Sequence, residues 1–137
     1  MPRRDSLQAK IEKRIAERSD DVFLTREFAD LGGERQVLRA LRKEVEAGGL
    51  IRLGYGVYGR AFKSQLSGKP VLYNKGGFTG AAREALDKLG VKWEPSDAER
   101  AYNEGRTTQI PMKPKLRVEG RFSRKLRDGA MELILER

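Results

Sequence analysis

The chain has 137 residues, of which 29 are Lys or Arg and 20 are Asp or Glu, so its formal net charge is +9. It has no cysteine and no histidine, which excludes disulfide scaffolds, thiolate nucleophiles, Cys/His zinc sites and His-based acid–base catalysis. No stretch approaches the roughly 18 apolar residues of a membrane helix, and residues 1–5 precede no apolar run. We therefore expect a cytoplasmic protein without a secretory signal, and an anionic polymer is the first partner to consider.

The N-terminal third has the spacing of a small helical unit. An apolar residue at every fourth position predicts a helix over residues 6–18, with Ser6 as its N-cap. Residues 22–24 are interpreted as an apolar link, and Thr25 is a suitable cap for a short second helix that ends near Leu31. Two glycines then predict a turn before a third helix.

This third helix is expected over residues 34–47, with Gly48 and Gly49 ending it. At about 100° per residue, its cations fall on one side and its apolar residues on another. The apolar side, which we expect to be core, contains Val37, Leu38, Leu41 and Val45.

Two apolar runs around a Gly-rich turn, within residues 50–60, have the signature of a β-hairpin. Helix, short helix, turn, helix and hairpin in this order predict a winged helix-turn-helix over residues 1–60. Residues 61–78 are interpreted as a connector, with a strand near Val71. Residues 79–137 are expected to form a small α+β domain that closes on a β-hairpin.

Within that second unit, we predict a helix over residues 80–89 and another from a Ser96 cap to about Glu104. The single tryptophan, Trp93, is expected in the core. The pattern changes to strand from Thr107 onward, and Asp128-Gly129 predicts the turn of the closing hairpin, with a last strand over residues 131–135.

A helix-turn-helix reads base edges with the N-terminal part of its recognition helix. The predicted base-reading residues are therefore Arg35, Gln36 and Arg39. Arginine suits the O6 and N7 atoms of guanine, and glutamine suits the N6 and N7 atoms of adenine. Arg42 and Lys43, further along the helix, are predicted to contact phosphate. A helix face that is merely solvated is the alternative interpretation.

The hairpin and the segment before it supply the other predicted phosphate contacts. These are Thr25, Arg52, Tyr55 and Arg60. Tyr55 at the hairpin tip could equally cover the hairpin core, and that is what we expect of Tyr58.

The C-terminal half is more basic than the first. Residues 106–127 contain eight cations and one acid, Glu119, whereas residues 1–60 contain thirteen cations and ten acids. Alternation over residues 113–117 predicts three cations on one strand face. This face could extend a DNA footprint, bind RNA, meet an acidic protein or simply be solvated. The predicted basic patch comprises Lys113, Lys115, Arg117, Arg121, Arg124, Lys125 and Arg127.

Several short motifs resemble those of the AbiEi-type antitoxin family. In the first half these are the Val-Phe pair at residues 22–23, the apolar positions of the third helix, and a Gly-x-Gly-x-Tyr ending over residues 54–58. In the second half, the stretch SDAERAYNEGRTTQIPMKP agrees at Ser96, Ala98, Ala101, Gly105, Thr107, Thr108, Gln109 and Pro111. The chain departs from the family pattern at Tyr102, Glu104 and Arg106.

This resemblance implies a bacterial or mobile-element antitoxin that represses its own operon by binding inverted repeats. Its functional partner would be a nucleotidyltransferase-like toxin, and the antitoxin would be a monomer or a weak dimer that pairs on DNA. We expect a sequence-specific double-stranded DNA-binding transcriptional regulator, with no enzymatic activity, cofactor or metal. The alternatives are a protein-binding module whose basic C-terminal sheet clamps an acidic partner, and an RNA-binding protein.

Overall fold

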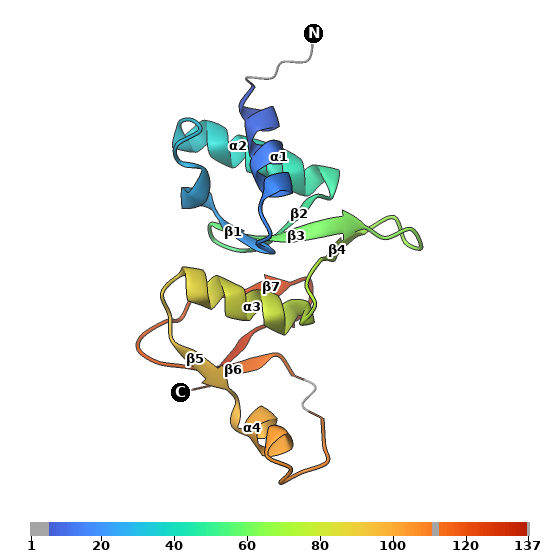
Figure 1. Ribbon diagram of the computed structural model, residues 1–137, viewed down its shortest axis with the longest axis vertical. Coiled ribbons are helices and arrows are strands. Elements are labelled where there is room, and N and C mark those ends of the chain that lie inside the picture. Colours follow the sequence, from blue (N-terminus) through green and yellow to red (C-terminus); the bar gives the residue numbers. More distant parts are fainter. Residues whose placement is uncertain (1–5, 111–112, 137) are drawn as a thin grey trace.

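The computed structural model describes residues 6–110 and 113–136, which form a mixed α+β structure (Figure 1). In these residues the helices are α1 (Leu7–Glu17), the short 3₁₀ helix η1 (Thr25–Phe28), α2 (Glu34–Ala47), α3 (Gly77–Lys88) and α4 (Asp97–Asn103). The strands are β1 (Val22–Leu24), β2 (Leu50–Gly54), β3 (Val57–Lys63), β4 (Pro70–Leu72), β5 (Trp93–Pro95), β6 (Lys115–Val118), β7 (Arg127–Asp128), β8 (Met131–Glu132) and β9 (Ile134–Glu136).

The central element is an antiparallel sheet in the order β1-β3-β2, with β4 paired to the far end of β3. Phe23 lies opposite Tyr58 in the first pairing, and Ile51 lies opposite Gly59 in the second. Helices α1 and α2 lie on one side of this sheet and α3 lies on the other, whereas the β3–β4 turn extends outward from the body (Figure 1). The sheet is therefore the middle of three layers.

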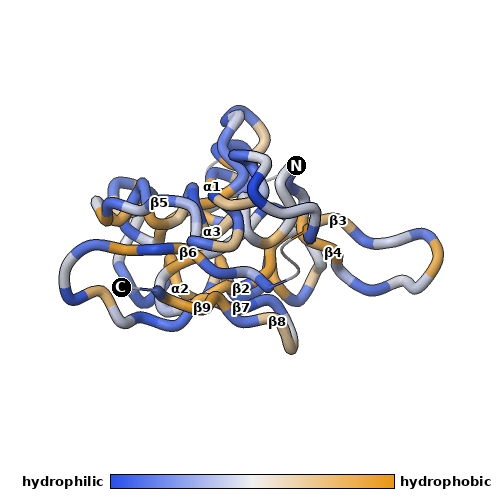
Figure 2. Tube along the Cα trace, turned by 90° about the horizontal axis from the view of Figure 1, so that it is seen from below, coloured by the Kyte–Doolittle hydropathy of each residue, from blue (hydrophilic) through white to orange (hydrophobic). Residues whose placement is uncertain are grey.

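Alternating side chains of the sheet enter two separate cores. On the side of α1 and α2, Phe23, Leu50 and Tyr58 are buried with residues such as Ile11 and Phe28. The opposite face packs on α3 and on the C-terminal strands, through Val22, Leu24, Leu53, Val57, Ala82, Leu86, Leu116, Leu126 and Leu133. In Figure 2 the apolar segments gather along these inner elements. The predicted units 1–60 and 79–137 thus share one of the two cores.

Polar contacts join the same two units at one end of α3. The Glu84 carboxylate accepts hydrogen bonds from the backbone N–H groups of Asp21 (3.0 Å) and Val22 (2.8 Å). The Lys88 ammonium donates to Asp20 Oδ2 at 2.6 Å and to both carboxylate oxygens of Glu27 at 2.9 Å. The bond from Lys88 lowers the pKa of Asp20. Helix α3 is therefore tied to the segment between α1 and α2 by charge as well as by packing.

Most helix predictions are confirmed, and the caps explain their ends. Ser6 Oγ accepts from the backbone N–H of Ala9 at 3.1 Å, and Ser96 Oγ accepts from that of Glu99 at 3.2 Å. Gly48 ends α2 with φ of 87°, the left-handed conformation that favours glycine at a helix C-terminus. Helix α3 begins at Gly77, three residues before the predicted start at residue 80.

The segment between α1 and α2 differs from the prediction. Residues 22–24 are not a link but strand β1, because their backbone pairs with β3. Thr25 is the first residue of η1 rather than its cap. The Glu27 carboxylate instead accepts from the backbone N–H of Leu24 at 2.7 Å, and the helix has only four residues.

The C-terminal strands are shorter than predicted. Residues 107–110 are not in a strand, and β6 begins only at Lys115. Strand β6 pairs antiparallel with β5, which was not predicted, and parallel with β9. The Asp128-Gly129 turn is confirmed between β7 and β8, but the predicted strand 131–135 is two strands, and the chain continues past the hairpin into β9.

Glu44 offers a pH-dependent test of the packing between α1 and α2. Its carboxylate accepts from Gln8 Nε2 at 2.5 Å, and partial burial together with a hydrogen bond to Glu12 raises the pKa of Glu44 to about 7. A raised carboxyl pKa means that the folded state binds the proton more tightly than the unfolded state. The ionised form therefore destabilises the fold, and stability increases as pH falls through 7.

We expect Glu44→Gln to raise the free energy of unfolding at about pH 8 by on the order of 1 kcal/mol, a value discounted for solvent screening. The gain should shrink towards zero near pH 5, where the carboxyl group of the folded protein is already neutral. Urea denaturation at both pH values measures the difference. Equal stabilisation by Glu44→Gln at both pH values would contradict the raised pKa of Glu44.

Candidate nucleic-acid interface

The outward face of α2 is a row of polar side chains held by a buried inner face. Val37, Ala40 and Leu41 are buried and fix the rotation of the helix on the sheet. All five predicted contact residues of the helix are exposed, and they are Arg35, Gln36, Arg39, Arg42 and Lys43. Their four cations form no ion pair within residues 6–110 and 113–136. Their full charge is therefore available to a partner.

The prediction that Leu38 belongs to the core is wrong, because 38% of its surface is exposed. Its helical position is at the edge of the apolar arc, and Ala40 is buried on the other edge. Leu38 instead lines a groove of about 330 Å³ between α2 and the β2–β3 hairpin, together with Arg42, Arg52 and Tyr55. The two predicted DNA-contacting elements therefore face one open groove, in which Leu38 lies beside Arg42 and Arg52 and which one acid, Glu34, also lines.

The hairpin presents Tyr55 as the most exposed part of this region. Tyr55 is 79% exposed, and Gly56 beside it has φ of 69°, which makes the tight turn possible. The carbonyl oxygen of Gly56 accepts from the backbone N–H of Thr25 at 3.0 Å, so the turn is held to the start of η1. Arg52 is exposed, whereas Tyr58 is buried at 6% exposure, as predicted.

A second basic segment meets the hairpin tip from the opposite side. We call residues 121–128 the C-terminal strap. Its Arg124 guanidinium donates to the carbonyl oxygen of Tyr55, and its Leu126 is buried in the core shared with α3. A Cβ atom on Gly54 would lie 2.6 Å from the carbonyl oxygen of Lys125, so only glycine permits this close approach. The strap therefore packs directly on the hairpin.

The predicted C-terminal basic patch is consequently divided. Arg124, Lys125 and Arg127 line the hairpin tip, with Arg121 exposed at the start of the strap. Lys115 and Arg117 lie on β6, where their half-buried side chains alternate with buried Leu116 and Val118. Each already faces a carboxylate: Lys115 is 3.9 Å from Glu136, and Arg117 is 3.2 Å from Asp97.

Residues of the 107–110 segment line a separate hollow of about 470 Å³. Thr107, Gln109 and the 63% exposed Ile110 contribute to it, together with the exposed Lys113 and the half-buried Lys115. Pro111, which completes the motif in the sequence, lies outside the described residues. The hollow gives the motif a surface of mixed apolar and basic character.

In two of the predicted phosphate contacts, the polar groups are bonded or buried within the fold. The Arg60 guanidinium donates to the carbonyl oxygens of Ile15 (2.9 Å), Arg18 (2.8 Å) and Asp20 (2.7 Å), and it lies over the Phe23 ring. It thereby stabilises the C-terminal end of α1. Thr25 lines the groove, but its Oγ1 atom is buried and has no hydrogen-bond partner among the described residues. We therefore leave both out of the candidate interface.

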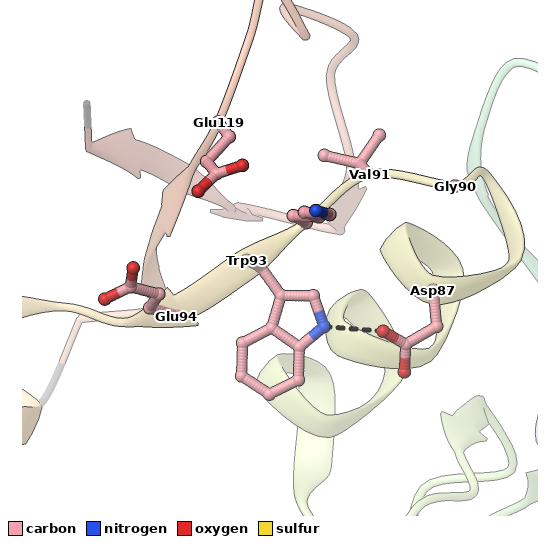
Figure 3. A pocket seen from close by; sticks show the side chains of 7 residues that line it. Asp87, Gly90, Val91, Trp93, Glu94 and Glu119 are labelled. Atoms are coloured by element: carbon pink, nitrogen blue, oxygen red, sulfur yellow. Dashed lines mark hydrogen bonds between the residues drawn. The ribbon is translucent and has the colours of Figure 1, made fainter.

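Another hollow, of about 650 Å³, has the opposite charge. Asp87, Glu94 and Glu119 lie around it with Lys92 and Trp93, and Trp93 Nε1 donates to Asp87 Oδ1 at 2.7 Å (Figure 3). Trp93 is half-buried and packs against the core shared with α3, so its predicted core position is partly confirmed. Its ring also supports the Arg83 guanidinium, 5.0 Å from the ring centroid. The acidic lining does not fit a phosphate backbone.

Among the described residues, no group of His, Cys, Asp or Glu side chains could hold a metal ion, and no helix is long and apolar enough to span a bilayer. A scan against protein-family models and searches of curated proteins and of solved structures found no match to this chain. The functional assignment therefore depends on the chemistry of the interface and on the sequence resemblance.

Arg60 and Arg39 form a matched pair of arginines, one bonded within the fold and the other free. We expect Arg60→Ala to lower the free energy of unfolding by about 2–3 kcal/mol, because three backbone carbonyl groups lose a charged donor. Arg39→Ala should change it by less than about 0.5 kcal/mol, since Arg39 is on the surface. Urea denaturation of both variants tests the assignment, and equal stability losses would contradict it.

Proposed function

We propose that this chain is a sequence-specific double-stranded DNA-binding protein that regulates transcription. In this proposal α2 is the recognition helix of a winged helix-turn-helix and the β2–β3 hairpin is its wing. The observation that carries the proposal is the exposed, unpaired basic face of α2 beside the hairpin that bears Arg52 and Tyr55.

The dimensions and chemistry of α2 support a major-groove contact. Its 14 residues span about 21 Å, and a helix fits the roughly 12 Å width of the major groove of B-DNA. Arg35, Gln36 and Arg39 lie in its N-terminal half, the part that meets base edges in helix-turn-helix proteins. Arg42 and Lys43 would contact the phosphates that flank the groove.

The order of the elements supports the same proposal. The chain runs α1, β1, η1, α2, β2, β3, with the hairpin directly after α2, which is the order of a winged helix. The short η1 takes the place of the helix before the turn. Thr25 to Gly56 hydrogen bonding fixes the hairpin to that segment, so α2 and the wing keep a constant separation.

The specific role that we propose is that of an antitoxin and autorepressor of a toxin–antitoxin operon. This role rests on the resemblance to AbiEi-type antitoxins, above all on the Thr107-Thr108-Gln109 motif. The hollow beside that motif supplies a surface outside the DNA-contacting region. Co-expression with a neighbouring nucleotidyltransferase-like gene would test the role, since rescue of growth by this chain is expected.

A protein-binding module remains the second candidate, because the Ile110 hollow and the exposed aromatic residues of the β3–β4 hairpin offer apolar contact area. Phe62 is 49% exposed and Tyr73 is 54% exposed, and the two rings pack edge to face. The basic C-terminal sheet itself is less suited to clamp an acidic protein, since Lys115 and Arg117 already face carboxylates of this chain. Recovery of one stoichiometric acidic protein without any operator binding would favour this candidate.

The proposed DNA binding is tested by titrating the protein with its own upstream DNA and with a scrambled duplex, between about 50 and 200 mM salt. A preference for the upstream DNA that persists at the higher salt concentrations supports base reading. Equal binding of both duplexes that disappears with salt would show only a general attraction to polyanions.

Arg39 provides the sharpest single-residue test of base reading. We expect Arg39→Ala to weaken binding to the operator by about 1–3 kcal/mol and to relax the base preference at one position. Binding to the scrambled duplex should change much less. An equal loss on both duplexes would instead identify Arg39 as a phosphate contact.

A further inference from the structure

The region with the most concentrated positive charge outside α2 lies between the hairpin turn and the C-terminal strap. A hollow of about 380 Å³ opens there, and its charged lining consists of Arg52, Arg124, Lys125 and Arg127. No acidic side chain lines it, in contrast to the acidic hollow at Trp93. Four cations thus surround one open depression.

These cations keep their charge free for a ligand. None of the four forms an ion pair with a described residue, and their hydrogen bonds go to backbone carbonyl groups. Arg52 Nε donates to Gly54 at 3.3 Å, Arg124 donates to Tyr55, and Arg127 Nε donates to Gly129 at 3.3 Å. A carbonyl oxygen orients a guanidinium without neutralising it, so the depression retains its positive potential.

The backbone around the depression is fixed on both sides. Leu53, in the strand beside the turn, is 1% exposed, and Leu126, in the middle of the strap, is also 1% exposed. The carbonyl oxygen of Leu126 accepts from the backbone N–H of Leu133 at 2.8 Å, which holds the strap to the last strands. The cations therefore project from a rigid base, although residues 52 and 124 are far apart in the chain.

The depression adjoins the same hairpin turn as the groove beside α2, because Arg52 and Tyr55 line both. A duplex in contact with α2 and the hairpin tip would bring its phosphate backbone next to the strap. We infer that the C-terminal strap, through Lys125 and Arg127 beside Arg52 and Arg124, is a second phosphate-binding surface that extends the DNA footprint beyond the winged helix. This inference rests on the proposed DNA binding and adds a role for the C-terminal half in it.

The test removes the strap charges that have no packing role. Lys125 and Arg127 are exposed, so Lys125→Gln/Arg127→Gln preserves Leu126 and the Arg124 bond to the hairpin. The matched control is Lys92→Gln/Lys113→Gln, whose side chains are also exposed. Lys92 lines the acidic hollow at Trp93, and Lys113 lines the hollow beside Thr107 and Gln109. Both variants lower the formal net charge from +9 to +7.

Affinity for the upstream and scrambled duplexes is measured with the full chain over about 50 to 200 mM salt, and urea midpoints confirm equal folding. If both strap residues contact phosphates, the plot of log affinity against log salt concentration should become less steep, its slope falling in magnitude by about 2 units on both duplexes. The preference for the upstream duplex should remain. The control variant should keep the slope of the unaltered protein.

Three results would overturn the inference while the proposed function stands, and the third is the assignment of the surface to RNA. One is an unchanged slope in the strap variant when the unaltered protein binds the upstream duplex specifically. Another is an equal decrease in strap and control variants, which would indicate overall charge rather than local contact. A strap variant that loses affinity only for an RNA hairpin used as competitor would assign the surface to RNA. Failure of the proposed function is distinct, since the unaltered protein would then show no preference between the duplexes.

Discussion

The burial of both faces of the β1-β3-β2 sheet is the constraint on which the candidate interface depends. Leu50 and Tyr58 pack under α2, whereas Leu53 and Val57, on either side of the hairpin turn, pack towards α3 and the C-terminal strands. An isolated two-stranded hairpin is marginally stable in water. Here core contacts on both faces fix the turn, so the position of Tyr55 relative to α2 is set by the whole fold.

Ion pairing within the fold determines which cations are left for a partner. Arg14 binds Asp30 through two hydrogen bonds of 2.6 and 2.9 Å, and it lowers the pKa of Asp30 to about 2. Lys88 and Arg60 are likewise directed into the structure, towards carboxylates and carbonyl groups. Asp20, Glu27 and Asp30 are engaged in these contacts, whereas the cations of α2 form no ion pair with a described residue. The modest charge excess of residues 1–60 is therefore a poor guide to the charge of the outward face of α2.

Helices and the hairpin could be predicted from sequence because their signals are local. The fourfold spacing of Leu7, Ile11 and Ile15 and the glycines after the third helix were sufficient for α1 and α2. Strands β1 and β5 have only three residues each, and partners far along the chain define them, so no local period reveals them. A three-residue apolar run is equally typical of a link.

The site was predicted less completely, for a related reason. The angular positions of the residues around the helix axis identified the exposed face of α2, because residues opposite the buried apolar ones must face outward. They misassigned Leu38, which lies at the boundary of the two faces, where the neighbouring hairpin leaves an open groove. The role of Arg60 depends on the carbonyl groups at the end of α1, and the contact of Arg124 with Tyr55 joins residues 69 positions apart. Neither has a signature in the local sequence.

The contact between Arg124 and Tyr55 links the C-terminal half of the chain to the hairpin of the proposed DNA-binding half. A wing that is held only by its own strands would lose conformational freedom when it binds DNA, and ordering each long side chain and loop reduces affinity. In this chain the strap, Leu126 in the core and the closely packed Gly54 already hold the hairpin in place before any ligand arrives. The C-terminal half thus preorganises the hairpin of the proposed DNA-binding half in addition to carrying charge of its own. Because the β1-β3-β2 sheet contributes to both the core under α2 and the core that holds the strap, the proposed base-reading and phosphate-contacting groups keep a fixed register with each other, which is the geometric condition for reading sequence on a duplex.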